Sequence, residues 1–523
     1  MTKLRVGEAL IRLLEQRGVE VVFGIPGVHT IELYRGLGAS AIRHVTPRHE
    51  QGAAFMADGY ARVTGKPGVC LLITGPGFTN ALTAIGQARG DSIPMFIISG
   101  VNARSTLGKG EGRLHELPDQ AGLSRTVCLE THTLLEPERL GDVVARAFDV
   151  MASGRPGPVH IEIPTDVMAE LIDFPEPPTS PEDHRHDPKS DEIDRAVTLC
   201  SSAKTPAIIA GGGMKDAVAL KRLAEALDAP VVSTVNARGL MAGHPLNVPA
   251  SPSLKAVRGL INESDLLLAL GTEIGETDYD FFMDGGLPSQ SNIIRVDIDP
   301  DQFKRRNDEG LMVEADAVAF AGALADRLTG RAGQGVERAL HTRQAALDEL
   351  PPDYRSHVDQ LHAIWRAVPE AIIVGDSTQA VYAGNLYTDA PSPHSWFNSS
   401  TGFGTLGYAA PAAIGAALGH PDRPVICLIG DGGLQFTLAE LGSAAECGAS
   451  VTFLVWNNEG YREIENFMVD ASFKPIGVKP STPDFAKIAE AYGLPAVHLS
   501  DPARLVEAIV VTPRPGLIEY RCP

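Results

Sequence analysis

Two groups of residues near the end of the chain combine oxygen ligands with closely spaced glycines. Gly430-Asp431-Gly432-Gly433 follows the apolar run Val425–Ile429, and Asn457-Asn458 follows the apolar run Val451–Trp456. If both runs are parallel strands, both groups lie at the carboxyl edge of one sheet, where open α/β sheets bind ligands. The Asp431 carboxylate and the Asn458 amide oxygen are hard donors suited to Mg²⁺ bridged to phosphates. Gly430, Gly432 and Gly433 allow close approach of a diphosphate, although an ordinary strand–turn–helix junction with an aspartate cap has the same residues.

Near the other end of the chain, Glu50 stands in the segment Arg48-His49-Glu50-Gln51-Gly52-Ala53-Ala54. A carboxyl group at this place can hold or transfer a proton, or it can simply be a helix-start carboxylate favoured by the helix dipole. His29 follows the turn Gly24-Ile25-Pro26-Gly27 and is either a proton donor near a substrate or a surface histidine. Thr74-Gly75-Pro76-Gly77 forms a similar turn.

Taken together, these motifs resemble those of the thiamine diphosphate (ThDP)-dependent decarboxylase and acetolactate synthase superfamily. The resemblance implies that Asp431, Asn458 and the Gly460 carbonyl hold the metal, and that Glu50 is the catalytic glutamate. In such enzymes this carboxyl group bonds N1′ of the aminopyrimidine, and the thiazolium accepts the electrons left when CO₂ departs. The family's glutamate reaches cofactor bound by a partner subunit, which implies a homodimer or a homotetramer.

The resemblance also assigns the remaining cofactor contacts. Gly402-Phe403-Gly404-Thr405-Leu406-Gly407-Tyr408 is similar to the family's segment under the aminopyrimidine, where the Gly404 carbonyl and the Leu406 amide would bond the ring. Leu406 stands where acetolactate synthases usually have Met. Gln379 and Ala380 are expected to contact the diphosphate, and the turns containing Gly27 and Gly75 are expected to face the cofactor.

The substrate is a small-molecule 2-oxo acid by the same resemblance. His115, Glu116 and Gln120 lie where relatives place substrate-side residues, but pyruvate decarboxylases have a His-His pair in place of His115-Glu116. The segments His115–Gln120, Gly271–Asp280 and Gly460–Ile464 look most like the 5-guanidino-2-oxopentanoate (2-ketoarginine) decarboxylase group. A guanidinium tail needs a carboxylate partner, and Glu463 is the first candidate, with Glu116 second. Glu463 is equally compatible with an exposed helix residue paired with a neighbouring charge.

Three alternatives stay open about cofactors and reaction. FAD is not expected, because the acidic segment Gly271–Asp280 has no arginine to meet a flavin phosphate, although such a run can also be a solvated loop. An acetolactate synthase-type carboligase would use the same residues to join two 2-oxo acids. A non-catalytic ThDP-binding regulatory paralogue would not need Glu50.

The elements that must position these residues are short buried strands alternating with helices, which predicts an α/β fold of three doubly wound parallel sheets. The expected domains cover residues 1–172 (pyrimidine-binding), 190–330 (central) and 355–523 (diphosphate-binding), joined between the first two by a polar, proline-rich linker at 175–191. The expected core strands are Val19–Phe23, Val69–Ile73, Met95–Ile98, Val159–Ile163, Ala207–Ala210, Pro230–Ser233, Leu266–Leu270, Ile293–Asp299, Ala371–Val374, Val425–Ile429, Val451–Trp456 and Leu517–Tyr520.

Charge and composition exclude several other classes. Lys and Arg total 45 against 65 Asp and Glu, a net charge of −20 that disfavours binding to nucleic acid or to a membrane surface. No apolar stretch approaches the ~18–20 residues that span a bilayer. The six cysteines show neither metal-ligand spacing nor a disulfide pattern, and with an N-terminus unlike a signal peptide they indicate a cytoplasmic protein.

Overall fold

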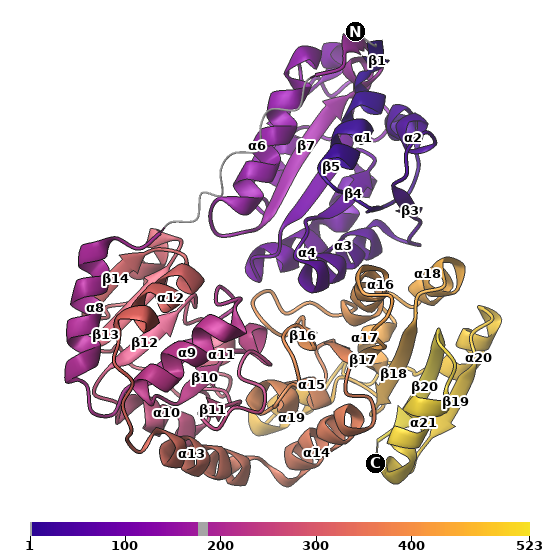
Figure 1. Ribbon diagram of the computed structural model, residues 1–523. Coiled ribbons are helices and arrows are strands. Elements are labelled where there is room, and N and C mark those ends of the chain that lie inside the picture. The colour runs from indigo at the N-terminus through magenta and orange to yellow at the C-terminus, as the bar shows by residue number, and fades with distance from the viewer. Residues whose placement is uncertain (1–2, 176–186, 523) are drawn as a thin grey trace. The chain divides into compact units, whose positions relative to one another are not determined.

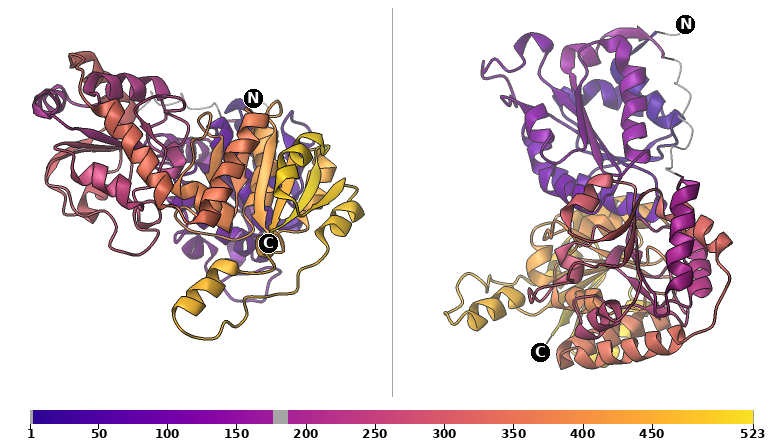
Figure 2. Two further views of the ribbon diagram at one scale, coloured as in Figure 1. Left: turned by 90° about the horizontal axis from the view of Figure 1, so that it is seen from below. Right: turned by 90° about the vertical axis from the view of Figure 1, so that its left-hand side faces the viewer.

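The computed structural model describes residues 3–175 and 187–522 of the 523-residue chain. Three six-stranded parallel sheets carry helices on their faces (Figures 1 and 2). The predicted fold class is therefore confirmed. The expected linker falls mostly on residues outside the described ranges, and its last two residues, Ser190 and Asp191, already belong to helix α8.

The first sheet has the strand order β3-β2-β4-β5-β7-β6. Its strands are β2 (Val21–Gly24), β3 (Arg43–Val45), β4 (Gly68–Leu72), β5 (Met95–Val101), β6 (Glu130–Thr133) and β7 (Pro158–Pro164). The helices of this part are α1 (Val6–Gln16), α2 (Ile31–Leu37), α3 (Glu50–Thr64), α4 (Pro76–Gly90), α5 (Gln120–Ser124), α6 (Leu140–Ala152) and α7 (Thr165–Met168). Strands β1 (Lys3–Arg5) and β8 (Leu171–Asp173) form a separate two-stranded antiparallel sheet.

The second sheet has the order β11-β10-β9-β12-β13-β14. Its strands are β9 (Ala207–Ala210), β10 (Val231–Ser233), β11 (Asn247–Val248), β12 (Leu267–Leu270), β13 (Ile293–Asp297) and β14 (Gly310–Glu314). The helices are α8 (Ser190–Ser202), α9 (Ala217–Leu227), α10 (Lys255–Asn262), α11 (Glu276–Tyr279), α12 (Ala317–Arg327) and α13 (Gly335–Glu349). Helix α14 (Pro352–Ala367) follows them and packs on α15 (Gln379–Leu386) of the next sheet. Buried aliphatic side chains from both sheet faces fill the core here.

The third sheet has the order β16-β15-β17-β18-β20-β19. Its strands are β15 (Ile372–Gly375), β16 (Trp396–Asn398), β17 (Val425–Gly430), β18 (Val451–Asn457), β19 (Ala496–Leu499) and β20 (Gly516–Arg521). The helices are α15 (Gln379–Leu386), α16 (Ala409–Gly419), α17 (Asp431–Leu434), α18 (Glu440–Cys447), α19 (Arg462–Asp470), α20 (Phe485–Ala491) and α21 (Leu505–Val511).

Internal contacts divide the chain into two compact units. Unit 1 comprises residues 1–184, 403–502 and 511–523, and unit 2 comprises residues 185–402 and 503–510. Within unit 1, helix α3 packs directly on α16, because glycines let the two backbones meet. A Cβ at Gly59 would lie 2.0 Å from the Ala412 carbonyl oxygen, and one at Gly415 would lie 1.9 Å from that of Met56. Helix α3, which begins at Glu50, is thereby fixed against the segment that leads from Phe403 into α16.

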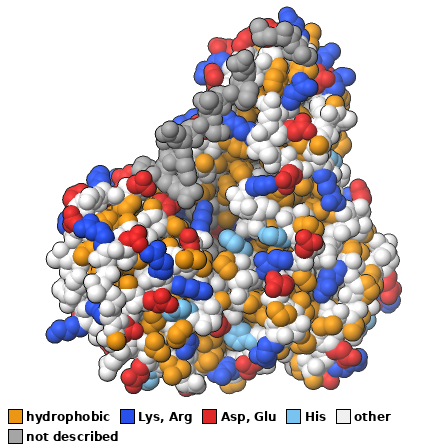
Figure 3. All heavy atoms as spheres, viewed as in Figure 1, with side chains coloured by type: hydrophobic (Ala, Val, Ile, Leu, Met, Phe, Trp, Pro, Cys, Tyr) orange, Lys and Arg blue, Asp and Glu red, His pale blue; other side chains and the backbone are white. Residues whose placement is uncertain are grey.

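Charged side chains are spread over the surface, and the cysteines form no disulfides. Figure 3 shows acidic and basic side chains interspersed with hydrophobic ones over the face it presents. The six cysteines are free thiols, four of them buried: Cys70, Cys128, Cys200 and Cys427. Among the described residues, no helix is both long enough and apolar enough to cross a membrane.

Candidate active site

Strands β17 and β18 bring Asp431 and Asn458 together. The parallel register pairs Gly430 with Trp456, so the residues that follow each strand meet at one sheet edge. The Asn458 backbone N–H donates to Asp431 Oδ1 at 3.4 Å, and the Thr482 hydroxyl donates to Oδ2 at 3.3 Å. Asp431 is 1% exposed, and burial raises the pKa of its carboxyl group above the usual value. A bound cation would offset that burial of charge.

The turn after Asn458 fits a metal and a diphosphate. Glu459 adopts a φ of 62° and Gly460 a φ of 146°, and a Cβ at Gly460 would lie 2.4 Å from the Val478 carbonyl oxygen. A Cβ at Gly432 would lie 2.5 Å from the Tyr461 ring. Both positions are therefore too crowded for a larger side chain. The donor set of Asp431, Asn458 and the Gly460 carbonyl consists of oxygens alone, the ligands that Mg²⁺ prefers.

Glu50 is the first residue of α3; one neighbour bonds its side chain, and another holds the backbone that precedes it. Asn80 Nδ2 on α4 donates to Glu50 Oε2 at 2.9 Å. The backbone N–H groups of Arg48 and His49 donate to Glu440 Oε1 at 3.0 and 3.1 Å. Burial raises the pKa of the Glu440 carboxyl group, against the effect of these hydrogen bonds. The residues before Glu50 are thus held by a buried carboxylate on α18.

His29 and His115, far apart in the sequence, lie with their ring centroids 5.5 Å apart. His29 is 7% exposed, and burial together with the charge of His115 lowers the pKa of its imidazole. Its Nδ1 has no hydrogen-bond partner among the described residues, while Nε2 lies 3.5 Å from Asn102 Nδ2. The pair therefore offers a buried imidazole that is neutral at neutral pH beside a more exposed one. The turn at Gly75 meets this pair, since a Cβ there would lie 2.5 Å from the His115 carbonyl oxygen.

The side chains of Gln120 and Glu116 are both hydrogen-bonded to neighbouring groups of the protein. Gln120 is 3% exposed, and its Oε1 accepts from Thr74 Oγ1 at 2.9 Å and from the Gly75 N–H at 3.1 Å. Its Nε2 donates to Ser99 Oγ and Glu162 Oε2, each at 3.0 Å. The Glu116 carboxylate accepts backbone N–H groups of its own loop, those of Gly110 at 2.8 Å and Arg113 at 2.9 Å, and these bonds lower its pKa.

The segment containing Gly404 and Leu406 is anchored on both sides within unit 1. The Thr405 N–H and hydroxyl both donate to Gln87 Oε1 at 3.3 Å, and the Tyr408 hydroxyl donates to Asp58 Oδ1 at 2.5 Å. Leu406 itself is half-buried between these anchors. Gly404 has a φ of +73°, a conformation that a side chain would strain.

The remaining predicted residues lie on three other elements. Gln379 and the buried Ala380 begin α15 in unit 2. Gly27 precedes His29, and a Cβ there would lie 2.5 Å from Ile73 Cγ2. Glu463 is half-buried in the first turn of α19, a helix with no fully buried residue that extends away from the third sheet in both views of Figure 2.

Several residues that build this site carried no motif in the sequence. Asn80, Gln87, Asn102, Glu440 and Thr482 act through partners more than 20 positions away. A weak signal exists for Glu440 alone, which is the one charged residue in the run Leu438–Ala445 of apolar and small residues.

Comparison with known proteins places the chain in a family. Models of the thiamine pyrophosphate enzyme N-terminal TPP-binding, central and C-terminal TPP-binding domains match residues 4–123, 193–324 and 376–518. A probable 2-ketoarginine decarboxylase of Pseudomonas aeruginosa is 44% identical over 94% of this chain and 88% of its own length. The chain belongs to the thiamine pyrophosphate enzymes.

Other members of this thiamine pyrophosphate (ThDP) enzyme family are more distant. Acetolactate synthase isozyme 1 large subunit of Escherichia coli is 32% identical over 98% of this chain and 93% of its own length. The acetolactate synthase of Arthrospira platensis is 32% identical over 94% of this chain and 89% of its own length. The expected family is confirmed, and the protein is a ThDP-dependent enzyme with two TPP-binding domains.

Proposed function

We propose that this ThDP enzyme decarboxylates a 2-oxo acid to an aldehyde and CO₂ with Mg²⁺, and that 5-guanidino-2-oxopentanoate is its favoured substrate. The observation that carries the proposal is the 44% identity, over nearly the whole chain, to a probable 2-ketoarginine decarboxylase. The placement of Glu50 by Asn80 and the pairing of Asp431 with Asn458 support it.

Asp431, Asn458 and the Gly460 carbonyl would hold Mg²⁺, and Gly430, Gly432 and Gly433 would face the diphosphate. When bound, ThDP supplies a sink for the electrons released as CO₂ leaves. Glu50 would hold a proton at a carboxyl oxygen toward the aminopyrimidine, with Asn80 orienting the other side of the group. The Gly404 carbonyl, the Leu406 amide, Gln379, Ala380, Gly27 and Gly75 complete the proposed cofactor contacts. We expect no FAD.

His29 and His115 are the proposed proton donors to the product carbon. A neutral imidazole has one N–H group and one accepting nitrogen, so His29 can donate a proton to the substrate from one ring nitrogen and take up another proton at the other. Gln120 positions the Gly75 turn rather than meeting the substrate, because all of its amide positions are already bonded.

For the cationic tail, we propose Glu463 as the first candidate carboxylate and Glu116 as the second. Glu116 already accepts several backbone N–H groups, so a guanidinium would have to compete with them. Glu463 lies in the first turn of α19, where Ile464 and Phe467 are 50% and 48% exposed and offer apolar contact for a methylene chain.

The sites are proposed to form in a homodimer or homotetramer. Large apolar side chains in unit 1 near the cofactor motifs are about half exposed in the single chain, among them Phe403 at 55% and Phe436 at 54%. Apolar surface of this kind favours burial against a second subunit.

The 32% identity to acetolactate synthases keeps carboligation as the second candidate activity. Incubating the purified protein with 5-guanidino-2-oxopentanoate or pyruvate, with ThDP and Mg²⁺ added or withheld, separates the candidates. The proposal expects equimolar CO₂ and guanidino aldehyde that depend on both additions. Acetolactate as the main product from pyruvate would favour the carboligase. Metal-dependent ThDP binding without turnover of any 2-oxo acid would favour a regulatory paralogue.

A further inference from the structure

Strand β20 contains a buried acidic residue next to the proposed metal-binding turn. Glu519 is 0% exposed and lies between the buried residues Ile518 and Tyr520. A carboxylate in such a place is costly unless its oxygens are bonded. Its position along the sheet matters, because β20 pairs with β18, the strand that ends at Asn457.

One oxygen of Glu519 faces Asn457. Asn457 Nδ2 donates to Glu519 Oε1 at 2.7 Å, and Arg521 Nε donates to the same oxygen at 3.2 Å. A carboxylate only accepts hydrogen bonds, so it can bond only the NH₂ end of the amide. The Asn457 amide is therefore held in one of its two possible orientations.

That orientation shapes the metal-binding turn. With its NH₂ group on Glu519, Asn457 directs Oδ1 to the backbone N–H of Glu459, which donates at 3.1 Å. Glu459 stands in the left-handed region, at a φ of 62°, between Asn458 and Gly460. The Cys522 N–H also donates to the Asn457 carbonyl at 2.8 Å, so β20 and the residue that follows it hold both the side chain and the backbone of this asparagine.

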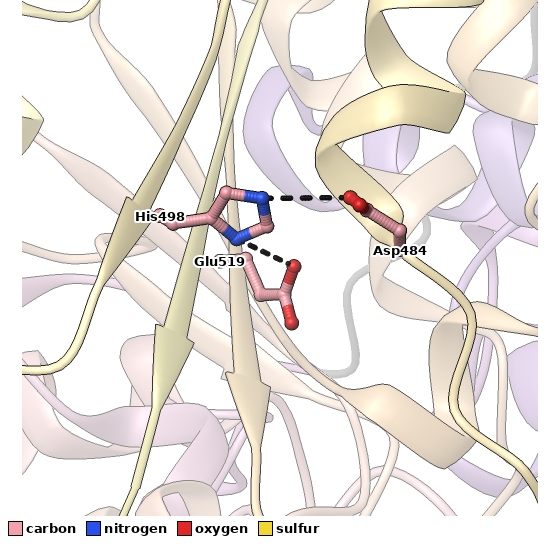
Figure 4. Close-up of side chains that lie close together, drawn as sticks. All are labelled: Asp484, His498 and Glu519. Atoms are coloured by element: carbon pink, nitrogen blue, oxygen red, sulfur yellow. Dashed lines mark ion pairs between the residues drawn. The ribbon is translucent and has the colours of Figure 1, made fainter.

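The other oxygen of Glu519 faces a histidine. His498 Nδ1 lies 3.0 Å from Glu519 Oε2, and His498 Nε2 lies 3.4 Å from Asp484 Oδ1. Figure 4 shows the imidazole between the two carboxylates, one at each ring nitrogen. Each carboxylate lies at a different ring nitrogen, so a protonated His498 would be an ion-pair partner of both Glu519 and Asp484.

We infer that Glu519 is a positioning residue for the metal: through Asn457 it holds the turn from which Asn458 and the Gly460 carbonyl bind Mg²⁺. The inference rests on the proposed metal site. Partners behind metal ligands typically change metal affinity by 10–100-fold when removed. Glu519 touches neither substrate nor cofactor, so its loss is expected to weaken metal binding without lowering kcat at saturating metal.

The test measures binding of Mn²⁺, as a spectroscopic substitute for Mg²⁺, to the full-length protein with ThDP by electron paramagnetic resonance. Glu519→Ala should raise the Mn²⁺ dissociation constant roughly 10–100-fold. The control Glu507→Ala removes an exposed carboxylate that pairs with Arg504 and should leave this constant unchanged. If Glu519→Ala does not fold, Glu519→Met, which fills the space with a side chain that cannot replace the carboxylate acceptor, should raise the constant by a similar factor of roughly 10–100. An unchanged constant in a folded variant overturns the inference.

A double-mutant cycle separates positioning from general loosening of the structure. If Glu519 acts through Asn457, Glu519→Ala should add less than about twofold once Asn457→Ala is present. Full additivity of the two effects would overturn the inference. Asp431→Ala should abolish Mn²⁺ binding. If it does not, the proposed metal site itself fails, which is distinguishable from failure of the role of Glu519.

Discussion

A buried charge network in unit 1 connects the start of α16 to helices α3 and α4. Disrupting this network should lower the free energy of unfolding by an amount that can be worked out from its burial. Arg62 Nε donates to Asp58 Oδ1 at 2.6 Å, and Arg62 Nη2 donates to Asp91 Oδ2 at 2.5 Å. Gln87 Nε2 donates to the same oxygen of Asp91 at 2.9 Å, and the Tyr408 hydroxyl donates to Asp58. The side chains of Arg62, Asp58 and Asp91 are 4%, 0% and 3% exposed.

Replacing Arg62 with Met would leave two carboxylates buried without their cation. Burial alone would lower the pKa of Arg62, but the charges of Asp58 and Asp91 hold it well above the ordinary value, so the guanidinium stays charged. Removing one partner of a buried ion pair costs about 3–5 kcal/mol. Since 1.36 kcal/mol corresponds to a factor of ten, the unfolding equilibrium should shift roughly 100- to 5000-fold. Tyr408→Phe removes one hydrogen bond to a charged group and should cost about 1.5–3 kcal/mol.

Arg35 provides the matched control. It bonds Glu32 at 2.7 Å, one helical turn away as Asp58 is from Arg62, but its side chain is 49% exposed. Arg35→Met should therefore cost less than about 1 kcal/mol. Urea unfolding followed by circular dichroism gives the three free energies. Equal losses for Arg62→Met and Arg35→Met would refute the reasoning, because burial would then not determine the cost.

Three further predictions concern substrate, acid stability and metal. Glu463→Gln should reduce kcat/KM for 5-guanidino-2-oxopentanoate at least about tenfold more than for unbranched 2-oxohexanoate, because a neutral amide cannot pair with a guanidinium; equal losses in steady-state assays would remove Glu463 from tail recognition. Burial lowers the pKa of His160 to about 3 from 6.5, so the unfolded chain takes up a proton below pH 6.5 that the folded chain refuses. Its contribution to stability is complete above pH 6.5 and falls by about 2 kcal/mol at pH 5, and urea titrations should show that this part of the pH slope is absent in His160→Gln. Chelation of divalent ions with EDTA should abolish CO₂ release and Mg²⁺ should restore it; full activity after exhaustive chelation would rule out the metal role of Asp431.

The core strands were predictable from the sequence, whereas the edge strands were not. Each of the twelve expected runs forms a strand within a few residues of its expected limits, because a strand covered on both faces is apolar throughout. The edge strands β3, β6 and β19 include sequences such as Arg43–Val45 and Glu130–Thr133, whose residues are partly exposed and polar. Without continuous burial they have no pattern that separates them from loops.

Some contacts of the candidate site could also be predicted from the sequence, and others could not. Asp431 and Asn458 could be expected to meet because parallel strands end at one sheet edge, and the structure places them in contact. The approach of His29 to His115 could not be expected, since it depends on how two loops fold over the sheet. The same holds for Asn80 and Glu519, whose partners lie 30 and 62 positions away.

Exchange of the hydrogen at C2 of bound ThDP tests the central claim most directly, because it reports the action of Glu50 before any substrate binds. The holoenzyme is transferred to D₂O, quenched in acid at set times, and the C2 proton is measured by NMR. We expect fast exchange in the wild-type protein and exchange at least about 100-fold slower in Glu50→Gln. Equal exchange rates in the two proteins, with ThDP bound to both, would contradict the claim.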